Sequence, residues 1–255
     1  MSTTDRRQKA FAEREQILLD GAHYLISREG LLNLQMHRVA QHCDYSVGTL
    51  YQHFSSKEDM LLALLTERIG DRLGLFARVA DWDAGSREQL VGLVVADVIF
   101  ARQQPLFFHL QQYLSTQVIS AAISEARREQ AMAAHKPLAD LFQGVIVEAL
   151  ARGDLSASGM TPIQIGSGLW ALGEGIHTLA HAEGLMDAYQ LGRPYALLFH
   201  HFHALLNGLG WQPLCDITDG RAVRALLTRV VTELFSDIPP SVTDTLFTDF
   251  DQDSP

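Results

Sequence analysis

Apolar residues recur at helical spacing along almost the whole chain, and no run alternates in the way a half-buried strand would. Hydrophobic residues make up 47% of the 255 positions, which is enough for one large core or two smaller ones. No apolar run approaches the roughly 20 residues that a membrane-spanning helix needs, and residues 1–11 lack the apolar core of a signal peptide. We therefore expect an all-α, cytoplasmic protein with no membrane partner.

The helices can be placed by their apolar stripes and their caps. A first stripe ends before Gly30, which follows Arg28 and Glu29 and is a good stop signal. Thr161 and Pro162 form a clean helix start, with Thr as N-cap and Pro in the first turn. Beyond the first 80 residues we expect helices over 86–103, 105–115, 118–152, 162–184, 194–209 and 219–236, with Pro137 kinking or splitting the third of these.

The most informative stretch runs from Val39 to Glu58. A short helix stops near Cys43, and the chain turns through Asp44 and Tyr45 before a second helix starts with Ser46 as its N-cap. We expect the second helix to turn its apolar side chains inward, namely Val47, Leu50 and Phe54. Its other side would carry small or hydrogen-bonding residues: Ser46, Gly48, Thr49, Gln52 and His53. Such a helix can enter the major groove of DNA, and Lys57 at the next helix start is a good phosphate clamp.

The charge distribution agrees with a local DNA contact. The chain carries a formal charge of −10, but residues 1–57 hold seven Lys or Arg against six Asp or Glu. The remaining residues hold thirteen basic and twenty-four acidic groups, so the rest of the chain is expected to be repelled by DNA. Any phosphate contact must then lie near the few basic side chains of the first part: Arg6, Arg7, Lys9, Arg38 and Lys57.

These patterns predict three parts. Residues 1–57 form a helix-turn-helix DNA-binding domain, which a linking helix over 56–79 joins to a second helical domain over 80–236. The linking helix would bury Leu61, Leu62, Leu65, Ile69, Leu73 and Phe76. Residues 237–255 hold five Asp and no Lys or Arg, so we expect a mobile acidic tail.

The segment from about Arg14 to Leu65, and above all the run from Val47 to Glu58, resembles the tetracycline-repressor (TetR) family. The resemblance implies an all-α homodimer with a three-helix head and a ligand-binding body that releases a DNA operator when occupied. By position, Ser46, Gly48, Thr49, Gln52 and His53 would face bases. Phosphates would be held by Tyr51, His53 and Lys57, with His37 and Tyr45 at the margin.

Three residues depart from the family pattern. Asp44 stands where glycine is usual in the turn, and we expect the turn to survive because Asp tolerates the left-handed conformation. Gln35 replaces Ser or Thr, so the cap of the preceding helix is expected to shift to Asn33. Tyr45 replaces a small apolar residue, and either packs inward or reaches the DNA backbone.

In the regulatory domain we expect a ligand pocket and a dimer interface. The effector is expected to be small and largely apolar. The candidate pocket residues are Phe100, Phe107, Phe108, Tyr113, Phe142 and Trp170, with Glu174 or His177 as the polar contact that orients a ligand. In the family the last two body helices form the interface, which suggests Leu169, Gly173, Phe199, Phe202 and Leu206 here.

Two other readings remain open. Glu174 and His177 have the spacing of helical di-iron sites, so a helical enzyme or metalloprotein is one alternative, although a second such pair is missing. Cys43 and Cys215 are too few and too far apart for a metal site or a disulfide framework. We therefore expect no cofactor and no enzymatic activity. The other alternative is a regulator without a small-molecule effector, whose body serves dimerisation or a protein partner.

Overall fold

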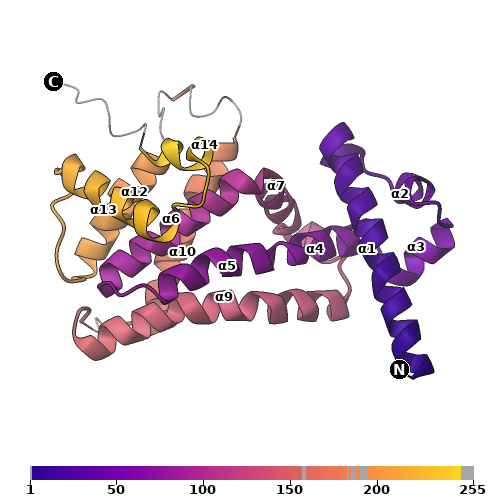
Figure 1. Ribbon diagram of the computed structural model, residues 1–255, viewed down its shortest axis with the longest axis horizontal. Coiled ribbons are helices and arrows are strands. Elements are labelled where there is room, and N and C mark those ends of the chain that lie inside the picture. The colour runs from indigo at the N-terminus through magenta and orange to yellow at the C-terminus, as the bar shows by residue number, and fades with distance from the viewer. Residues whose placement is uncertain (1, 157–158, 183, 185–187, 190–193, 248–255) are drawn as a thin grey trace. The chain divides into compact units, whose positions relative to one another are not determined.

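The computed structural model describes residues 2–156, 159–182, 184, 188–189 and 194–247, and all regular elements in these ranges are helices (Figure 1). The chain divides into two compact units. Residues 1–69 and 109–135 form the first, here called the head unit. Residues 70–108 and 136–255 form the second, here called the body unit. The expected all-α fold class is confirmed.

The head unit is built on a long first helix. Helix α1 (Thr3–Glu29) packs against α2 (Met36–His42) and α4 (Lys57–Glu67), and α2 packs against α3 (Val47–His53) (Figure 1). A 3-10 turn, η1 (Leu31–Asn33), follows α1. The apolar stripes of these helices meet in one core, which includes Leu18, Ala22, Ile26, Val39, Ala40, Leu50, Phe54 and Leu61. The expected stop at Gly30 is present, with a φ of 87°.

The predicted linking helix over 56–79 is two helices. Helix α4 ends at Glu67, Arg68 forms the break, and α5 (Ile69–Ala80) follows. The Arg68 amide donates to the carbonyls of Leu65 and Thr66 instead of continuing the regular pattern, and the two units divide directly after Ile69. Leu73 is half-buried, whereas the other five predicted core residues of this stretch are buried.

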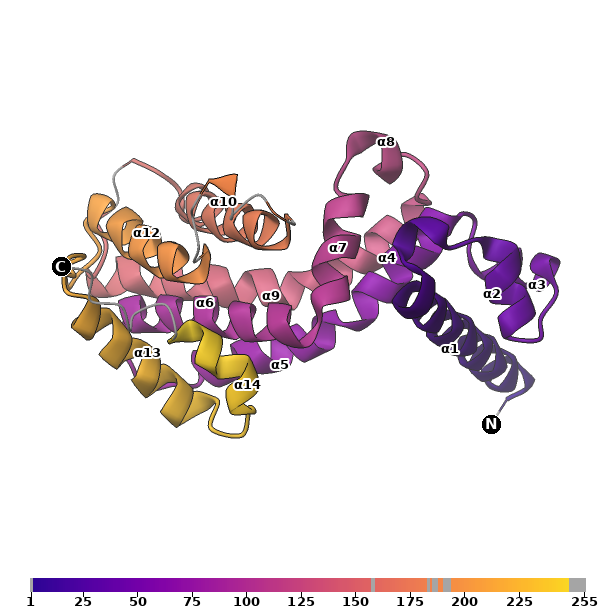
Figure 2. The same ribbon diagram turned by 90° about the horizontal axis from the view of Figure 1, so that it is seen from above.

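Residues 109–135 also depart from the predicted division, because they pack with residues 1–69 although they begin thirty residues after the end of the predicted linking helix. They comprise most of α7 (Pro105–Leu114), α8 (Gln117–Ser120) and the start of α9 (Glu125–Arg152). Figure 2 shows α8 at the turn between α7 and α9. The predicted helix over 118–152 therefore has a break before Glu125, while α9 itself runs through Pro137.

The body unit is organised around α6 (Ser86–Gln103), which is buried on nearly all sides. It packs against α12 (Pro194–Gly208), α13 (Gly220–Leu234) and α14 (Pro240–Thr243). Helix α10 (Pro162–His181) lies beside α12 in both views (Figures 1 and 2). No single described helix is long and apolar enough to cross a membrane, although α6 and α7 would pass that test together as a pair bent by 97°.

A buried arginine ties three segments of the body unit together. Arg87 donates to the carbonyls of Trp211 (2.7 Å) and His203 (3.1 Å) and to Oδ1 of Asn207 (2.8 Å). Burial lowers the pKa of Arg87 and lowers the pKa of His203 to about 4. Neutral acceptors thus surround this guanidinium, so the start of α6 and the end of α12 are joined by hydrogen bonds rather than by an ion pair.

The expectation of a mobile tail from residue 237 is wrong for residues 237–247. Asp237 accepts from Arg78 Nη1 (2.6 Å) and Nη2 (3.0 Å), and the chain continues through α14 and the 3-10 turn η2 (Asp244–Leu246). Leu246 and Thr243 are buried. The acidic composition predicted mobility, but the ion pair between Arg78 and Asp237 and the buried side chain of Leu246 hold this stretch in place. Residues 248–255 lie outside the described ranges.

Leu246→Ala should therefore destabilise the protein by about 2–5 kcal/mol, because it removes a fully buried side chain and leaves a cavity. Urea denaturation of the full chain measures this loss. Asp244→Ala is the control, since Asp244 is exposed in the same turn and should change the free energy of unfolding by less than about 0.5 kcal/mol. Equal stability of Leu246→Ala and the unsubstituted chain would contradict the anchoring of this segment.

Candidate functional site

The turn between α2 and α3 has the geometry of a Schellman motif. Asp44 adopts a φ of 58°, and the expectation that it tolerates the left-handed conformation is confirmed. The amide of Tyr45 donates to the carbonyl of Ala40 (2.9 Å), and that of Asp44 donates to the carbonyl of Gln41 (3.3 Å). These bonds end α2 and direct the chain into α3 without a glycine.

The start of α2 differs from expectation. Gln35 is its N-cap residue but makes no side-chain capping bond. Asn33 does not cap α2 either, because its side-chain amide donates to the carbonyl of Glu29 at the end of α1 (2.6 Å). Asn33 thus closes the first helix rather than opening the second.

Helix α3 begins as predicted and presents a polar surface. Ser46 accepts a hydrogen bond from the amide of Thr49 (3.0 Å). Tyr51 is 51% exposed, Gln52 and Gly48 are exposed, and Thr49 is half-buried. Leu50 and Phe54 are fully buried, as expected, but Val47 is 42% exposed and joins the outer surface. The outer face of α3 therefore carries Ser46, Val47, Gly48, Tyr51 and Gln52.

Gly48 lies on this face with open space around it. A Cβ added there would meet only the Ser46 hydroxyl, at an ordinary contact distance of 3.7 Å. Packing within the chain therefore does not require glycine at this position. Gly21 is a contrasting case, since a Cβ there would lie 2.3 Å from the sulfur of Cys43.

His53 does not belong to the outer face, which corrects the prediction that it faces bases and phosphates. Its side chain is 1% exposed and stacks on Phe11 of α1 with ring centroids 3.9 Å apart. Its Nδ1 lies 3.5 Å from a carboxylate oxygen of Glu15. The sequence could not reveal this contact, because Phe11 is more than forty residues away.

Lys57 and the other predicted phosphate contacts lie outside the outer face of α3. Lys57 is half-buried and donates to the carbonyl of Leu31 (3.2 Å), and burial lowers the pKa of its ammonium group. His37 is exposed and Tyr45 is half-buried. Arg38 is paired with Glu29, whereas Arg6 and Arg7 are exposed in the first turns of α1. These two arginines therefore lie on a helix that Ser2 caps.

In the body unit the structure brings together four of the predicted pocket residues. Phe100, Phe107 and Phe108 are buried and contact one another edge to face, with centroids 4.8–6.3 Å apart. The ring of His177 stacks on Phe108 at 4.4 Å, and His181 stacks beside it at 5.6 Å. We call these five residues the aromatic cluster.

A buried polar network adjoins the aromatic cluster. Arg72 donates to Asp97 Oδ1 through Nε (2.8 Å) and Nη2 (2.6 Å). His177 Nε2 lies 3.1 Å from Asp97 Oδ2, and its Nδ1 lies 3.3 Å from the Tyr195 hydroxyl. A proton on Nε2 lets His177 donate to Asp97 and accept from Tyr195. Burial raises the pKa of Tyr195 to about 12.

Sequence reasoning found His177 but missed Arg72, Asp97 and Tyr195. A signal was available for Asp97, because it is a lone carboxylate within the apolar run from Leu93 to Phe100. A charged side chain in such a run is buried only if it has a partner, so the sequence predicts a buried cation or hydrogen-bond donor beside Asp97.

The other four predicted pocket residues lie elsewhere. Tyr113 is in the head unit, where its hydroxyl donates to Glu58 (3.3 Å). Trp170 is 63% exposed and donates to Glu174 (3.0 Å) on the same helix. Phe142 is half-buried beside Gly166, where a Cβ would lie 3.1 Å from its ring. The predicted set of eight is therefore not one constellation.

The predicted dimer-interface residues are placed inside the chain. Leu169, Phe199, Phe202 and Leu206 are 0–2% exposed, and Gly173 is half-buried. The predicted interface residues instead belong to the core between α10 and its neighbours. Helical spacing shows that a stripe is apolar, but it does not show whether the stripe packs within the same chain or against a second copy. The exposed stripe of α10 instead carries Ile163, Ser167, Trp170, Ala171 and Thr178.

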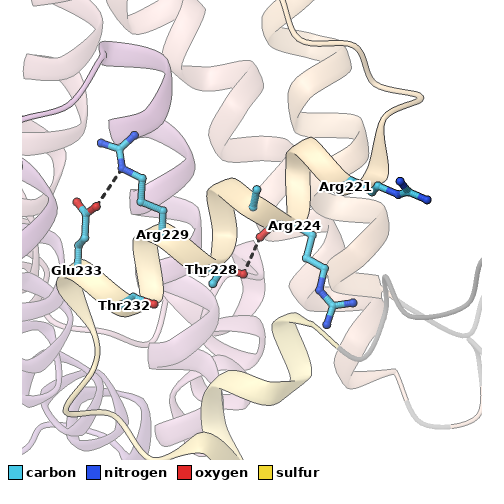
Figure 3. Close-up of a pocket in the computed structure, with 7 residues that line it drawn as sticks. Arg221, Arg224, Thr228, Arg229, Thr232 and Glu233 are labelled. Atoms are coloured by element: carbon cyan, nitrogen blue, oxygen red, sulfur yellow. Dashed lines mark hydrogen bonds and ion pairs between the residues drawn. The ribbon is translucent and has the colours of Figure 1, made fainter.

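A hollow on the surface lies along α13 (Figure 3). Its lining comes from this helix alone: Arg221, Arg224, Ala225, Thr228, Arg229, Thr232 and Glu233. Figure 3 shows Arg229 paired with Glu233, at 3.1 Å. The predicted aromatic residues do not line this face. Within the described ranges, no three His, Cys, Asp or Glu side chains come together to hold a metal ion.

Residues 18–64 match the family model for bacterial regulatory proteins of the tetR family. An HTH-type transcriptional regulator of Staphylococcus aureus is 30% identical over 74 residues, which are 29% of this chain and 40% of that protein. The HTH-type transcriptional repressor KstR of Rhodococcus jostii is 39% identical over 71 residues, which are 27% of this chain and 34% of the repressor. The matches thus span well under half of these curated relatives.

The fold as a whole resembles that of solved regulators. The transcriptional regulator FadR from Bacillus subtilis, solved in complex with stearoyl-CoA, aligns with a TM-score of 0.57. The alignment covers 76% of this chain and 98% of FadR, at 18% identity. This likeness extends the shared fold beyond the N-terminal residues into the helical body.

Because Asp97 is ionised within the polar network, the free energy of unfolding should depend on pH. Burial would raise the pKa of Asp97, but the charge of Arg72 and the hydrogen bond from His177 together lower it from 3.8 to about 2. The stabilisation, about 2 kcal/mol, should be complete above pH 4 and be lost as the pH falls through 2. Urea denaturation between pH 2 and 6 should show a smaller loss for Asp97→Asn, and equal pH dependence of both proteins would contradict the assignment.

Proposed function

We propose that this chain is a ligand-responsive repressor of the tetR family of bacterial regulatory proteins, whose family model matches residues 18–64. It binds a pseudo-palindromic DNA operator as a homodimer and releases it when a largely apolar effector occupies the body unit. The observation that carries this proposal is the outer face of α3, which is polar, exposed and held by a fully buried inner side.

The outer face of α3 suits the major groove. Gln52 can form paired hydrogen bonds with an adenine edge, and Thr49 or Val47 can contact a thymine methyl group. Gly48 leaves room for close approach of the DNA backbone. Tyr51 is half exposed, so its hydroxyl can reach a phosphate while its ring packs on the helix.

Phosphate contacts come from groups around α3. Arg6 and Arg7 are exposed on α1, whose Phe11 stacks on His53 at the end of α3. Lys57 would exchange its bond to the Leu31 carbonyl for a phosphate. Since the rest of the chain is acidic, binding depends on these few cations and should be sensitive to salt.

Dimerisation follows from the geometry of an operator with two half-sites. Two copies of α3 must reach successive major grooves, roughly 34–36 Å apart or a multiple of that distance. We assign the dimer contact to the exposed stripe of α10, where Ile163 is 64% exposed and Trp170 63% exposed. In this proposal a second copy of the chain covers these two apolar side chains.

The effector binds, in this proposal, at the aromatic cluster. Phe107 and Phe108 lie near the start of α7, and their rings offer an apolar contact surface beside His177, whose ring nitrogens already pair with Asp97 and Tyr195. The likeness of the fold to that of FadR, which was solved with stearoyl-CoA, makes a long acyl chain the first effector class to test.

The DNA proposal is tested by titrating fragments from upstream of the protein's own gene, then by genome-wide selection of bound fragments. Tyr51→Ala and Gln52→Ala should each weaken specific binding by about 5- to 150-fold, since a good base or phosphate contact contributes about 1–3 kcal/mol. Lys57→Ala should also reduce the salt slope by about 0.9 per lost phosphate contact.

Gln112→Ala, an exposed change on α7, is the control. Affinity that depends on neither sequence nor salt would exclude a DNA-binding regulator.

The effector proposal is tested with stearoyl-CoA as the probe and free coenzyme A as the control. At a hundredfold excess over its dissociation constant, a bound effector should stabilise the body by about 2.7 kcal/mol. It should also weaken operator binding by about 5–150-fold. Phe108→Ala should reduce both effects. Unchanged operator affinity and melting temperature would instead favour a regulator whose body contacts only a second copy or a protein partner.

A further inference from the structure

The segment from residue 109 to residue 135 is attached to the DNA-binding helices through Asp59. One carboxylate oxygen of Asp59 accepts from the amide (3.0 Å) and hydroxyl (2.8 Å) of Ser55. The other accepts from the amide and hydroxyl of Ser124, both at 2.9 Å. Ser124 is the residue before α9 and accepts from the amide of Arg127 (3.3 Å). Asp59 therefore joins the start of α4 to the start of α9.

From this start of α9, Arg127 reaches the end of α3. Its Nη2 donates to the carbonyl of His53, the last residue of α3, at 3.4 Å. Its Nη1 donates to Glu15 of α1 at 3.1 Å, and its guanidinium lies over the ring of Phe54 at 5.4 Å. The side chain is only 14% exposed. One side chain thus contacts the end of α3, the residue that follows it, and α1.

Arg127 stands where a helix disfavours a cation. The first turn of α9 carries the positive end of the helix dipole, so a positive side chain there costs about 0.3–1 kcal/mol. Its neighbour Arg128 avoids much of this cost by remaining exposed to solvent, with a bond to the carbonyl of Ser120 (3.2 Å). Arg127 is instead half-buried, and its compensation comes from Glu15, the His53 carbonyl and Phe54. Arg127 is thus kept at an unfavourable position of its helix by specific contacts to other helices, which points to a specific role for this side chain.

We infer that Arg127 is a positioning residue for DNA recognition, which holds α3 at the angle that the operator requires. This inference rests on the proposed function, because it assigns Arg127 a part in presenting the outer face of α3. Arg127 does not itself contact DNA. Arg127 acts from the first turn of α9, whose residues up to His135 belong to the head unit.

The test compares three variants of the full chain. Arg127→Met keeps the length of the stem and removes the charge, Arg127→Lys keeps the charge but loses the paired donors, and Arg128→Met is the matched control. Hydrogen exchange without DNA measures the opening of α3, and titration with the operator fragment at several salt concentrations measures affinity and salt slope.

We expect Arg127→Met to speed exchange of the α3 amides about tenfold and to weaken operator binding by a similar factor. The salt slope should not change, because no phosphate contact is lost. Arg127→Lys should be intermediate, and it decides the outcome if Arg127→Met fails to fold. Arg128→Met should match the unsubstituted chain.

Three results would overturn the inference. Arg127→Met could behave like Arg128→Met, or the salt slope could fall by about 0.9, which would make Arg127 a phosphate contact. Exchange could also rise equally in α1, α4 and α9, which would mean only a general loss of stability. If the unsubstituted chain binds no DNA, the proposed function fails, and the exchange of the α3 amides alone decides whether Arg127 holds α3.

Discussion

The carboxylate of Asp59 is the contact on which the head unit depends. It is buried, and it accepts hydrogen bonds from the amide and the hydroxyl of both Ser55 and Ser124, which are 69 residues apart. Burial would raise its pKa, but these hydrogen bonds lower it. Bonds to a charged acceptor contribute about 1.5–3 kcal/mol each, so this one side chain can hold two helix starts in register. The placement of Arg127 against α3 follows from that register.

Much of the fold could be predicted from local patterns. The bounds of α6, α10, α12 and α13 agree with the predicted ranges to within about three residues, because apolar periodicity and caps such as Thr161 are local signals. The membership of residues 109–135 in the head unit could not be predicted in this way. It depends on Asp59 and Ser124, and a capping serine looks the same in sequence whether or not a distant carboxylate binds it.

The candidate DNA-binding and ligand-binding residues show the same difference between local signals and contacts that join distant parts of the chain. The turn at Asp44 and the cap at Ser46 were predictable because each is made within a few residues of chain. His53 was misplaced because its partner Phe11 comes from another helix. In the body, periodicity identified apolar residues such as Phe199 and Leu206, but it could not say whether they face the same chain or a second copy. Burial in the folded chain settles that they belong to its own core.

Gly48 has a consequence for how this protein can be altered. Alanine is a better helix former than glycine, and in the first turn of α3 nothing within the chain obstructs a methyl group at Gly48. A selection for thermal stability alone would therefore favour alanine at this position, and would add a methyl group to the outer face of α3. Under the proposed function, stability and access to the operator pull in opposite directions at this residue, so a thermostabilised variant of the chain should leave Gly48 unchanged.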